Sequence, residues 1–266
     1  MGQGVVWYTG QFYAMSFMQK TMNIESAQVD SMMALALFLG TPFFVFFGWL
    51  SDKIGRKPII LAGMFIAIFA YRPIYDAMYK SVNLENKVLA DKGLVEEKTA
   101  VIHPKITGDS LITYRTQKTY ADGFFVQKDS IVHWSANTPI LKDGKEEAPT
   151  IHTAVTVNPD TRWTLVFLVF LQVLFVTMVY GPIAAFLVEM FPIRIRYTSM
   201  SLPYHIGNGV FGGLLPAVST YLSTTAHEGG NAQWYLEGLW YPIIVAAICF
   251  IIGLIYLKGN DNQTKD

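Results

Sequence analysis

The sequence predicts an all-α polytopic membrane protein with six transmembrane helices and one inserted, β-rich domain outside the membrane. Of its 266 residues, 52% are hydrophobic and only 15% are charged, whereas a soluble domain has about 25% charged residues. The mean hydropathy is +0.32. Twenty-one of the forty charged residues lie between Lys80 and Asp160. The chain therefore consists of a polar block inserted into a very apolar remainder.

Composition also excludes several classes of protein. Twenty Lys and Arg balance twenty Asp and Glu, so the net charge gives no indication of a nucleic-acid partner. The single cysteine, Cys249, excludes an internal disulfide framework and any cysteine-rich metal centre. His103, His133 and His152 lack the spacing of metal ligands. We therefore expect no metal and no cofactor.

Six stretches meet the requirement of about twenty mostly apolar residues for a helix that crosses a bilayer. They are residues 1–19, Val29–Leu50, Pro58–Tyr79, Trp163–Leu187, Thr198–Leu222 and Leu239–Leu257. The first lacks the basic region of a signal peptide, so we expect it to be retained. Arg72 and Asp76 share one face of the third span. We expect them to form a pair that reaches toward the outer interface rather than to bind substrate.

The basic residues of short loops predict the orientation. Those after the second span, after the fourth span and in the tail all fall on one side: Lys53, Arg56, Lys57, Arg194, Arg196, Lys258 and Lys265. Only Lys20 opposes this pattern. We therefore expect a plasma (inner) membrane protein with both termini in the cytoplasm and residues 80–161 outside it.

The polar block, residues 80–161, is predicted to fold into a small β-rich domain. Residues 100–117 and 123–134 mix β-branched and aromatic side chains with polar ones. Asp122-Gly123 and Asp143-Gly144 mark turns. The block divides the chain into residues 1–79 with three spans, residues 162–258 with three spans, and a cytoplasmic tail, 259–266.

The strongest motif runs from Gly48 to Pro58, GWLSDKIGRKP, in the tight turn between the second and third spans. Gly48 is expected to allow close helix approach, and Gly55 to adopt a turn conformation that a side chain would oppose. Asp52 is placed to cap the following helix. Gly55 is followed by two basic residues, Arg56 and Lys57, which are typical of a cytoplasmic loop.

This run resembles the signature loop of the major facilitator superfamily, with the pattern G-x-x-x-D-[RK]-x-G-[RK]-[RK]. The resemblance covers residues 1–79 and 162–258, and not the polar block. It implies a latch that holds the cytoplasmic side of a transporter closed. The residues that match the pattern are Gly48, Asp52, Gly55, Arg56 and Lys57.

A second resemblance narrows the family. The run from Tyr180 to Ser199 is similar to the end of the tenth helix and the following loop in that superfamily, and its E-x-F-P-x-x-x-R pattern occurs in sugar porters. The runs Ser201–Gly213 and Val6–Ala14 more closely resemble the metabolite:proton symporters, such as the proline/betaine, α-ketoglutarate, shikimate and citrate permeases. The resemblance implies the C-terminal six-helix half of such a carrier, with the N-terminal half supplied in cis or in trans.

Two groups of site residues follow. Glu189 is expected to pair with Arg56 or Arg196 at an inner gate that also holds Arg194. Polar side chains within the spans are candidates for the substrate or proton pathway: Tyr8, Gln11, Tyr13, Tyr204, His205 and Asn208. His205 can titrate near neutral pH. Packing is the alternative role for Tyr8, Tyr13 and Asn208.

The sequence therefore predicts a proton-coupled secondary transporter, not an enzyme, for a small organic acid, amino acid or betaine. Its partners would be the lipid bilayer, the solute, protons and the missing half, with no nucleic acid. One alternative is a membrane-anchored binding or sensor protein that uses residues 80–161. Another is a sugar-porter-like facilitator.

Overall fold

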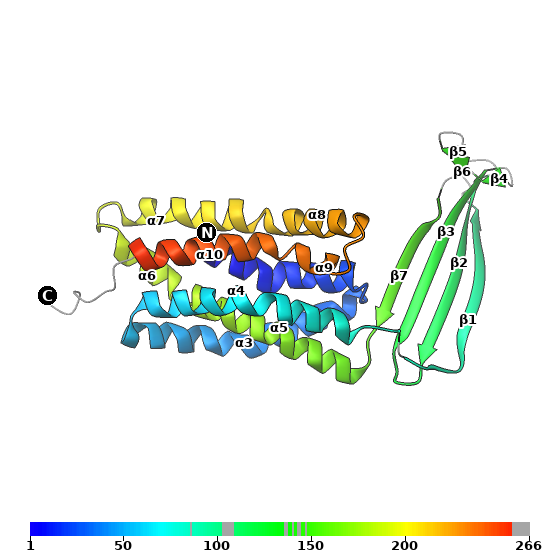
Figure 1. Cartoon of the computed structure of the whole chain (residues 1–266), viewed down its shortest axis with the longest axis horizontal. Coiled ribbons are helices and arrows are strands. Elements are labelled where there is room, and N and C mark those ends of the chain that lie inside the picture. The colour runs from blue at the N-terminus through cyan, green and yellow to red at the C-terminus, as the bar shows by residue number, and fades with distance from the viewer. Residues whose placement is uncertain are drawn as a thin grey trace.

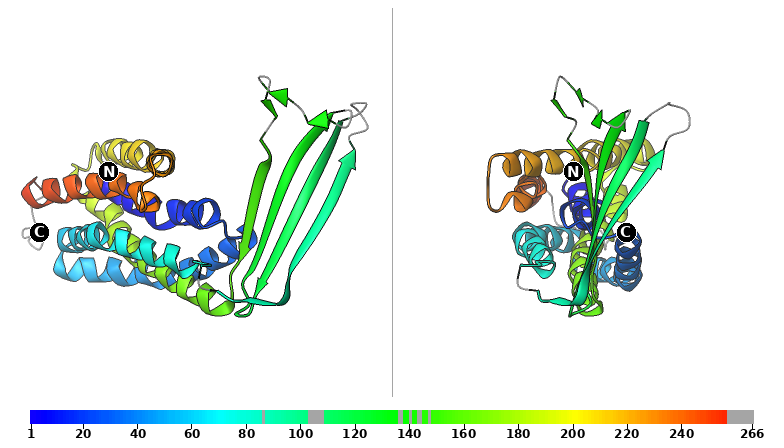
Figure 2. Two further views of the ribbon diagram at one scale, coloured as in Figure 1. Left: turned by 45° about the vertical axis from the view of Figure 1, so that its right-hand side comes forward. Right: turned by 90° about the vertical axis from the view of Figure 1, so that its right-hand side faces the viewer.

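The computed structural model describes residues 1–85, 87–102, 109–135, 138–139, 141–142, 145–146 and 148–256. A bundle of helices carries a β-sheet that projects from one end (Figures 1 and 2). The predicted tail 259–266, the turn at Asp143-Gly144 and His103 lie outside the described residues.

Three long helices of the bundle pack together. Helix α3 (Ser26–Ile54) and helix α4 (Arg56–Ser81) are joined through Gly55, and α5 (Pro159–Tyr180) packs against both. Asn158 caps α5: its side chain accepts a hydrogen bond from the Thr161 amide at 2.9 Å, and proline occupies the favoured first position of the helix. Helix α6 (Ile183–Met190) follows.

Two of the six predicted spans are helical but interrupted. The first consists of α1 (Gly2–Tyr8), η1 (Thr9–Tyr13), α2 (Ala14–Ser16) and η2 (Phe17–Thr21), in which both η segments are π-helical. The fifth consists of α7 (Arg196–His205), the π-helical η3 (Ile206–Gly212) and α8 (Leu215–Glu228). Glycines in η3 and Pro203 in α7 weaken the regular α-helical bonding. Helices α9 (Trp234–Glu237) and α10 (Trp240–Tyr256) complete the bundle.

The N-terminus lies partway along the bundle and not at the end that carries the α3–α4 turn (Figure 1). A Cβ added at Gly207 in η3 would lie 2.7 Å from the Met1 nitrogen. The cytoplasmic placement of both termini stays a prediction.

Among the described residues, four helical stretches are long and apolar enough to cross a membrane: Ser26–Ile54, Arg56–Ser81, Pro159–Met190 and Trp234–Tyr256. Only 17% of the most apolar stretch of α3 is buried inside the chain. Its outward side chains include Phe38 and Val45, each 75% exposed. A helix that is apolar on its exposed side requires an apolar surrounding, which a bilayer provides.

Tyrosines fix the first interrupted helix to α4. Tyr71 and Tyr75 are fully buried. Their hydroxyls donate to the carbonyls of Val6, at 3.1 Å, and Thr9, at 2.8 Å, where α1 passes into η1. A buried polar group needs such a partner. The two bonds also fix the register of the first helix against α4.

Arg72 and Asp76 do not pair with each other as expected. Arg72 lies 3.7 Å from the Glu237 carboxylate and 4.8 Å from the centre of the Trp240 ring. The Asp76 carboxylate accepts hydrogen bonds from the Tyr235 hydroxyl at 2.7 Å and from Lys80 at 2.6 Å. These side chains instead hold α4 against α9 and α10.

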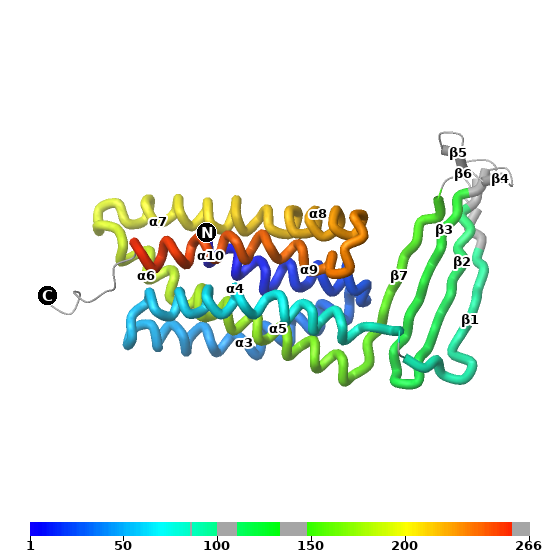
Figure 3. Tube along the Cα trace, in the orientation of Figure 1, coloured from blue at the N-terminus to red at the C-terminus, as the bar shows by residue number. Residues whose placement is uncertain are grey.

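The expected β structure is present as an antiparallel sheet in the order β1 (Leu89–Ile102), β2 (Asp109–Tyr120), β3 (Phe125–Ser135), β7 (Thr150–Thr156). The short β4 (Thr138–Pro139) also pairs with β3, and β5 (Leu141–Lys142) pairs with β6 (Lys145–Glu146). Figure 3 traces the four longer strands side by side. The turn expected at Asp122-Gly123 is confirmed, with Gly123 at φ 89°.

The base of the sheet is tied to the bundle. Ile24 forms a parallel bridge with Val155. The Gln28 side chain donates to the Val157 carbonyl and accepts from the Val157 amide, each at 2.9 Å. These bonds join β7 and the start of α5 to the N-terminal end of α3.

Candidate functional site

The α3–α4 turn contains the first candidate cluster. Gly55 adopts φ 94° and ψ 150°, a region that side chains oppose, so the prediction for this residue is confirmed. The predicted cap is wrong: Gly55 is the residue at the cap position, and no side chain caps α4. Asp52 remains in the last turn of α3 and contacts Arg56 instead, at 3.1 Å.

Arg56 is the centre of this cluster. Its Nε donates to Glu189 Oε2 at 2.7 Å, and its Nη2 donates to Glu189 Oε1 at 2.5 Å. The Arg56 side chain is 18% exposed, the Glu189 side chain 27% and the Asp52 side chain 63%. A two-pronged arginine–carboxylate bond fixes both distance and orientation. The turn is thereby attached to α6.

The rest of the turn contacts other elements. Lys57 donates to the Leu254 carbonyl on α10 at 3.1 Å. Arg196 donates to the Phe191 carbonyl at 3.1 Å, and Arg194 is exposed. Of the two partners expected for Glu189, the structure therefore brings Arg56 to it. The Arg56 guanidinium thus lies between two carboxylates, Asp52 of α3 and Glu189 of α6.

The ends of α3 and α5 approach each other closely near this turn, but Gly48 is not the residue whose small size allows it. A Cβ added at Gly48 would meet nothing within 4 Å. A Cβ at Gly181, at the end of α5, would lie 3.2 Å from the Phe44 carbonyl and 3.5 Å from the Gly48 nitrogen. Gly181 is therefore the residue whose small size lets the two backbones meet.

A second cluster forms a half-buried aromatic face on α1, α5 and α7. The hydroxyls of Tyr180 and Tyr204 contact each other. The Trp7 ring centre lies 5.5 Å from that of Tyr180 and 5.1 Å from that of Tyr8. The exposed His205 ring lies 5.8 Å from the Tyr204 ring, edge to face. Three helices thus supply hydroxyl, imidazole and indole groups to one region.

Gln11 also stays half-buried, whereas Tyr13 and Asn208 point into the packed interior. Tyr13 is 3% exposed, and its ring centre lies 5.5 Å from that of Tyr75. Asn208 is 9% exposed and accepts a hydrogen bond from Gln3 at 3.2 Å. The structure therefore places these two residues in packing positions.

The sequence does not identify Trp7, Tyr180 or Gln3 as site residues. Tyr180 begins the run that leads to Glu189, and Trp7 lies in the N-terminal run Val6–Ala14. Nothing in either run indicates which aromatic rings converge, because that depends on how α1, α5 and α7 pack. Gln3 carries no such signal.

Comparisons with known proteins give partial similarity to transporters. The chain is 35% identical over 96 residues to a citrate-proton symporter of Salmonella typhi, covering 36% of this chain and 20% of the relative. It is 29% identical over 104 residues to an alpha-ketoglutarate permease of Escherichia coli, covering 39% of this chain and 22% of the relative. A third relative, from Haemophilus influenzae, is named provisionally as a metabolite transport protein. It is 33% identical over 106 residues, 40% of this chain and 21% of its own length.

The chain therefore matches about a fifth of the length of each of these relatives. No family model matches the chain. No solved structure matches it either. The similarities support a link to membrane transporters of small metabolites, and they give no support to an enzyme.

Proposed function

We propose that this chain is the C-terminal six-helix half of a proton-coupled secondary transporter for a small organic solute, of the metabolite:proton symporter type in the major facilitator superfamily. One observation carries the proposal. In the tight turn between two apolar helices, Arg56 is held by Asp52 in its own turn and by Glu189 on α6. The partial similarity to a citrate-proton symporter and an alpha-ketoglutarate permease supports the same conclusion.

The Arg56 cluster would act as the inner latch. A hydrogen bond to a charged group contributes about 1.5–3 kcal/mol. Closed and open states that differ by that amount remain interconvertible, because 1.4 kcal/mol corresponds to about a tenfold change in population. The latch would thus bias alternating access without preventing it.

The proposed orientation in the membrane rests on what lies at each end of the helix bundle. The α3–α4 turn and the sheet lie at opposite ends (Figure 1). We place the turn, with its basic residues, in the cytoplasm and the sheet outside an inner membrane. The interrupted first and fifth helices would then be the remaining two spans. Residues 80–161 would be a domain inserted between the third and fourth spans.

The aromatic face would meet the solute. Tyr8, Gln11, Tyr204 and His205 offer hydroxyl, amide and imidazole donors, which suit the carboxylate of an organic acid. His205 would take part in proton coupling, since an imidazole ring can accept and donate a proton through its two nitrogens. The missing N-terminal half would cover this face from the other side.

The test joins this chain to the N-terminal six helices of the Escherichia coli alpha-ketoglutarate permease and measures uptake of labelled α-ketoglutarate into vesicles with a proton gradient. Arg56→Glu and Glu189→Arg should each abolish uptake, and the double charge swap should restore part of it. Arg196→Glu is the matched control, because among the described residues the Arg196 side chain donates to a backbone carbonyl and forms no ion pair. Uptake that is lost in both single variants and not restored in the pair would refute the latch.

A further inference from the structure

A cavity of about 370 Å³ lies where the sheet meets the helix ends. It is separate from the Arg56 cluster and from the aromatic face. Its walls come from the chain after η2, from the end of α4 with the residues that follow, and from β3 and β7. Small-molecule sites commonly measure about 300–1,000 Å³ and occur preferentially where structural units meet. The cavity is therefore large enough for a small organic molecule.

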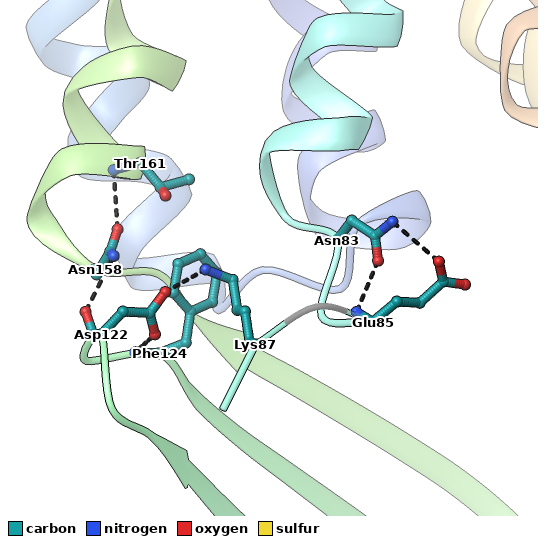
Figure 4. A network of polar contacts seen from close by, with 7 residues as sticks. All are labelled: Asn83, Glu85, Lys87, Asp122, Phe124, Asn158 and Thr161. Atoms are coloured by element: carbon teal, nitrogen blue, oxygen red, sulfur yellow. Dashed lines mark hydrogen bonds and ion pairs between the residues drawn. The ribbon is translucent and has the colours of Figure 1, made fainter. Parts of the chain in front are cut away.

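Hydrogen bonds hold its walls in place. Asn23 adopts a left-handed conformation with φ 53°, and its carbonyl accepts from the Val155 amide at 2.7 Å. In the segment that follows α4, the Asn83 side chain accepts from the Glu85 amide at 2.9 Å and donates to the Glu85 carboxylate at 3.3 Å. Figure 4 shows this Asn83–Glu85 turn. Hydrogen bonds thus fix the conformation of both wall segments.

The lining has an apolar floor and a polar rim. Met22, Val82 and Val155 are buried, between 4% and 9% exposed. Asn23, Asn83 and Glu85 at the rim are exposed. The register pairs Lys128 with Thr153 and Val126 with Val155, so alternate residues of β7 face the cavity together with Val126. This combination suits a molecule with a short apolar body and one polar head.

The charge of the rim determines which head fits. Among the described residues that line the cavity, Glu85 is the only one with a formal charge. The nearby Lys87 does not line it, since its ammonium pairs with Asp122 and lies 3.8 Å from the centre of the Phe124 ring, as Figure 4 shows. A carboxylate at the rim favours a cation that can donate hydrogen bonds.

We propose that this cavity binds a small organic ammonium ion, with its alkyl chain on the Met22–Val82–Val155 floor and its ammonium group at Glu85. The ligand would contact the sheet and the helix ends at once. The site goes beyond the proposed transport function. It depends on the sheet and not on the inner latch, so it can be tested without any transport assay.

The experiment uses the full chain in nanodiscs of zwitterionic phosphatidylcholine, with calorimetric titration of n-butylammonium. Empty nanodiscs give the blank, and butyrate and n-butanol are probes of similar size without the positive charge. We expect saturable binding of n-butylammonium and at least tenfold weaker binding of the other two. Equal binding of butyrate, or no binding of n-butylammonium above the blank, would overturn the proposal.

Variants locate the site. Glu85→Gln should weaken n-butylammonium binding at least tenfold. Glu96→Gln is the matched control, since Glu96 is an exposed carboxylate on β1 that does not line the cavity, and it should bind as the unmodified chain does. Thr153→Phe fills the cavity from the sheet side and should abolish binding while circular dichroism stays unchanged. Binding unaffected by both Glu85→Gln and Thr153→Phe would refute the assignment.

Discussion

Replacing two glycines of the same motif, Gly48 and Gly55, by alanine should have opposite effects on stability. Gly55 adopts φ 94° and ψ 150°, and an added Cβ would meet only the Pro58 side chain, at 3.6 Å. The cost of Gly55→Ala is therefore that of the backbone conformation, about 1–3 kcal/mol. Gly48 lies inside α3, where an added Cβ would meet nothing within 4 Å. Gly48→Ala should therefore stabilise the chain by about 0.5–1 kcal/mol, since alanine loses less entropy in a helix.

The free energy of unfolding of both variants can be measured by titration with SDS in mixed micelles, followed by tryptophan fluorescence. Maleimide modification of Cys249, the single and partly buried cysteine, gives a second probe of unfolding. The two variants are matched, because each adds one methyl group to the same motif. Equal destabilisation by both, or a Gly55→Ala variant as stable as the unmodified chain, would refute the reasoning from backbone conformation.

Three further changes have defined outcomes. In a double-variant cycle, Arg56→Gln and Glu189→Gln should each destabilise the chain, with a coupling of about 1.5–3 kcal/mol between them, and additive effects in SDS titration would contradict the two-pronged bond. Gly4→Ala should destabilise the chain by about 1–3 kcal/mol, because its Cβ would lie 2.5 Å from the Gly207 carbonyl, whereas Gly209→Ala would meet nothing within 4 Å and serves as control. Hydrogen bonding to Arg115 holds the pKa of Asp129 below its usual range, so this carboxylate stabilises the sheet fully above the ordinary carboxyl pKa of about 3.9 and loses that effect as the pH falls through the lowered pKa. Hydrogen exchange of β2 and β3, corrected for intrinsic rates, should therefore accelerate at low pH, and a pH profile unchanged in Asp129→Asn would show that another group is responsible.

Features set by local chemistry could be predicted from the sequence. The long apolar stretches predicted α3, α4, α5 and α10. The β-branched and aromatic residues of the polar block, residues 80–161, predicted the sheet. The turn at Gly55 followed from the conformational freedom of glycine. These features depend on residues that are close together in the chain, so a single sequence contains enough information about them.

Features set by packing could not be predicted in the same way. The first helix is held against α4 by hydrogen bonds from Tyr71 and Tyr75, and Gly4 lies in close contact with Gly207 of the fifth helix. These contacts join segments that are far apart in the chain. Asp52 was expected at a helix cap, but a nearby arginine engages it instead.

The candidate site also combines local features with features set by packing. The turn conformation at Gly55 could be predicted from the neighbouring residues. The choice of Arg56 over Arg196 as the partner of Glu189, and the convergence of Trp7 with Tyr180, required the positions of whole helices.

The most direct test of the central claim compares proton-driven uptake of α-ketoglutarate and citrate by two reconstituted proteins. One is this chain alone, and the other is this chain joined to an N-terminal six-helix half. Because half of a carrier provides only one wall of a solute pathway, we predict no uptake above empty vesicles for the chain alone. For the joined protein we predict uptake that collapses with the proton gradient. Clear proton-dependent uptake by the chain alone would contradict the proposed function.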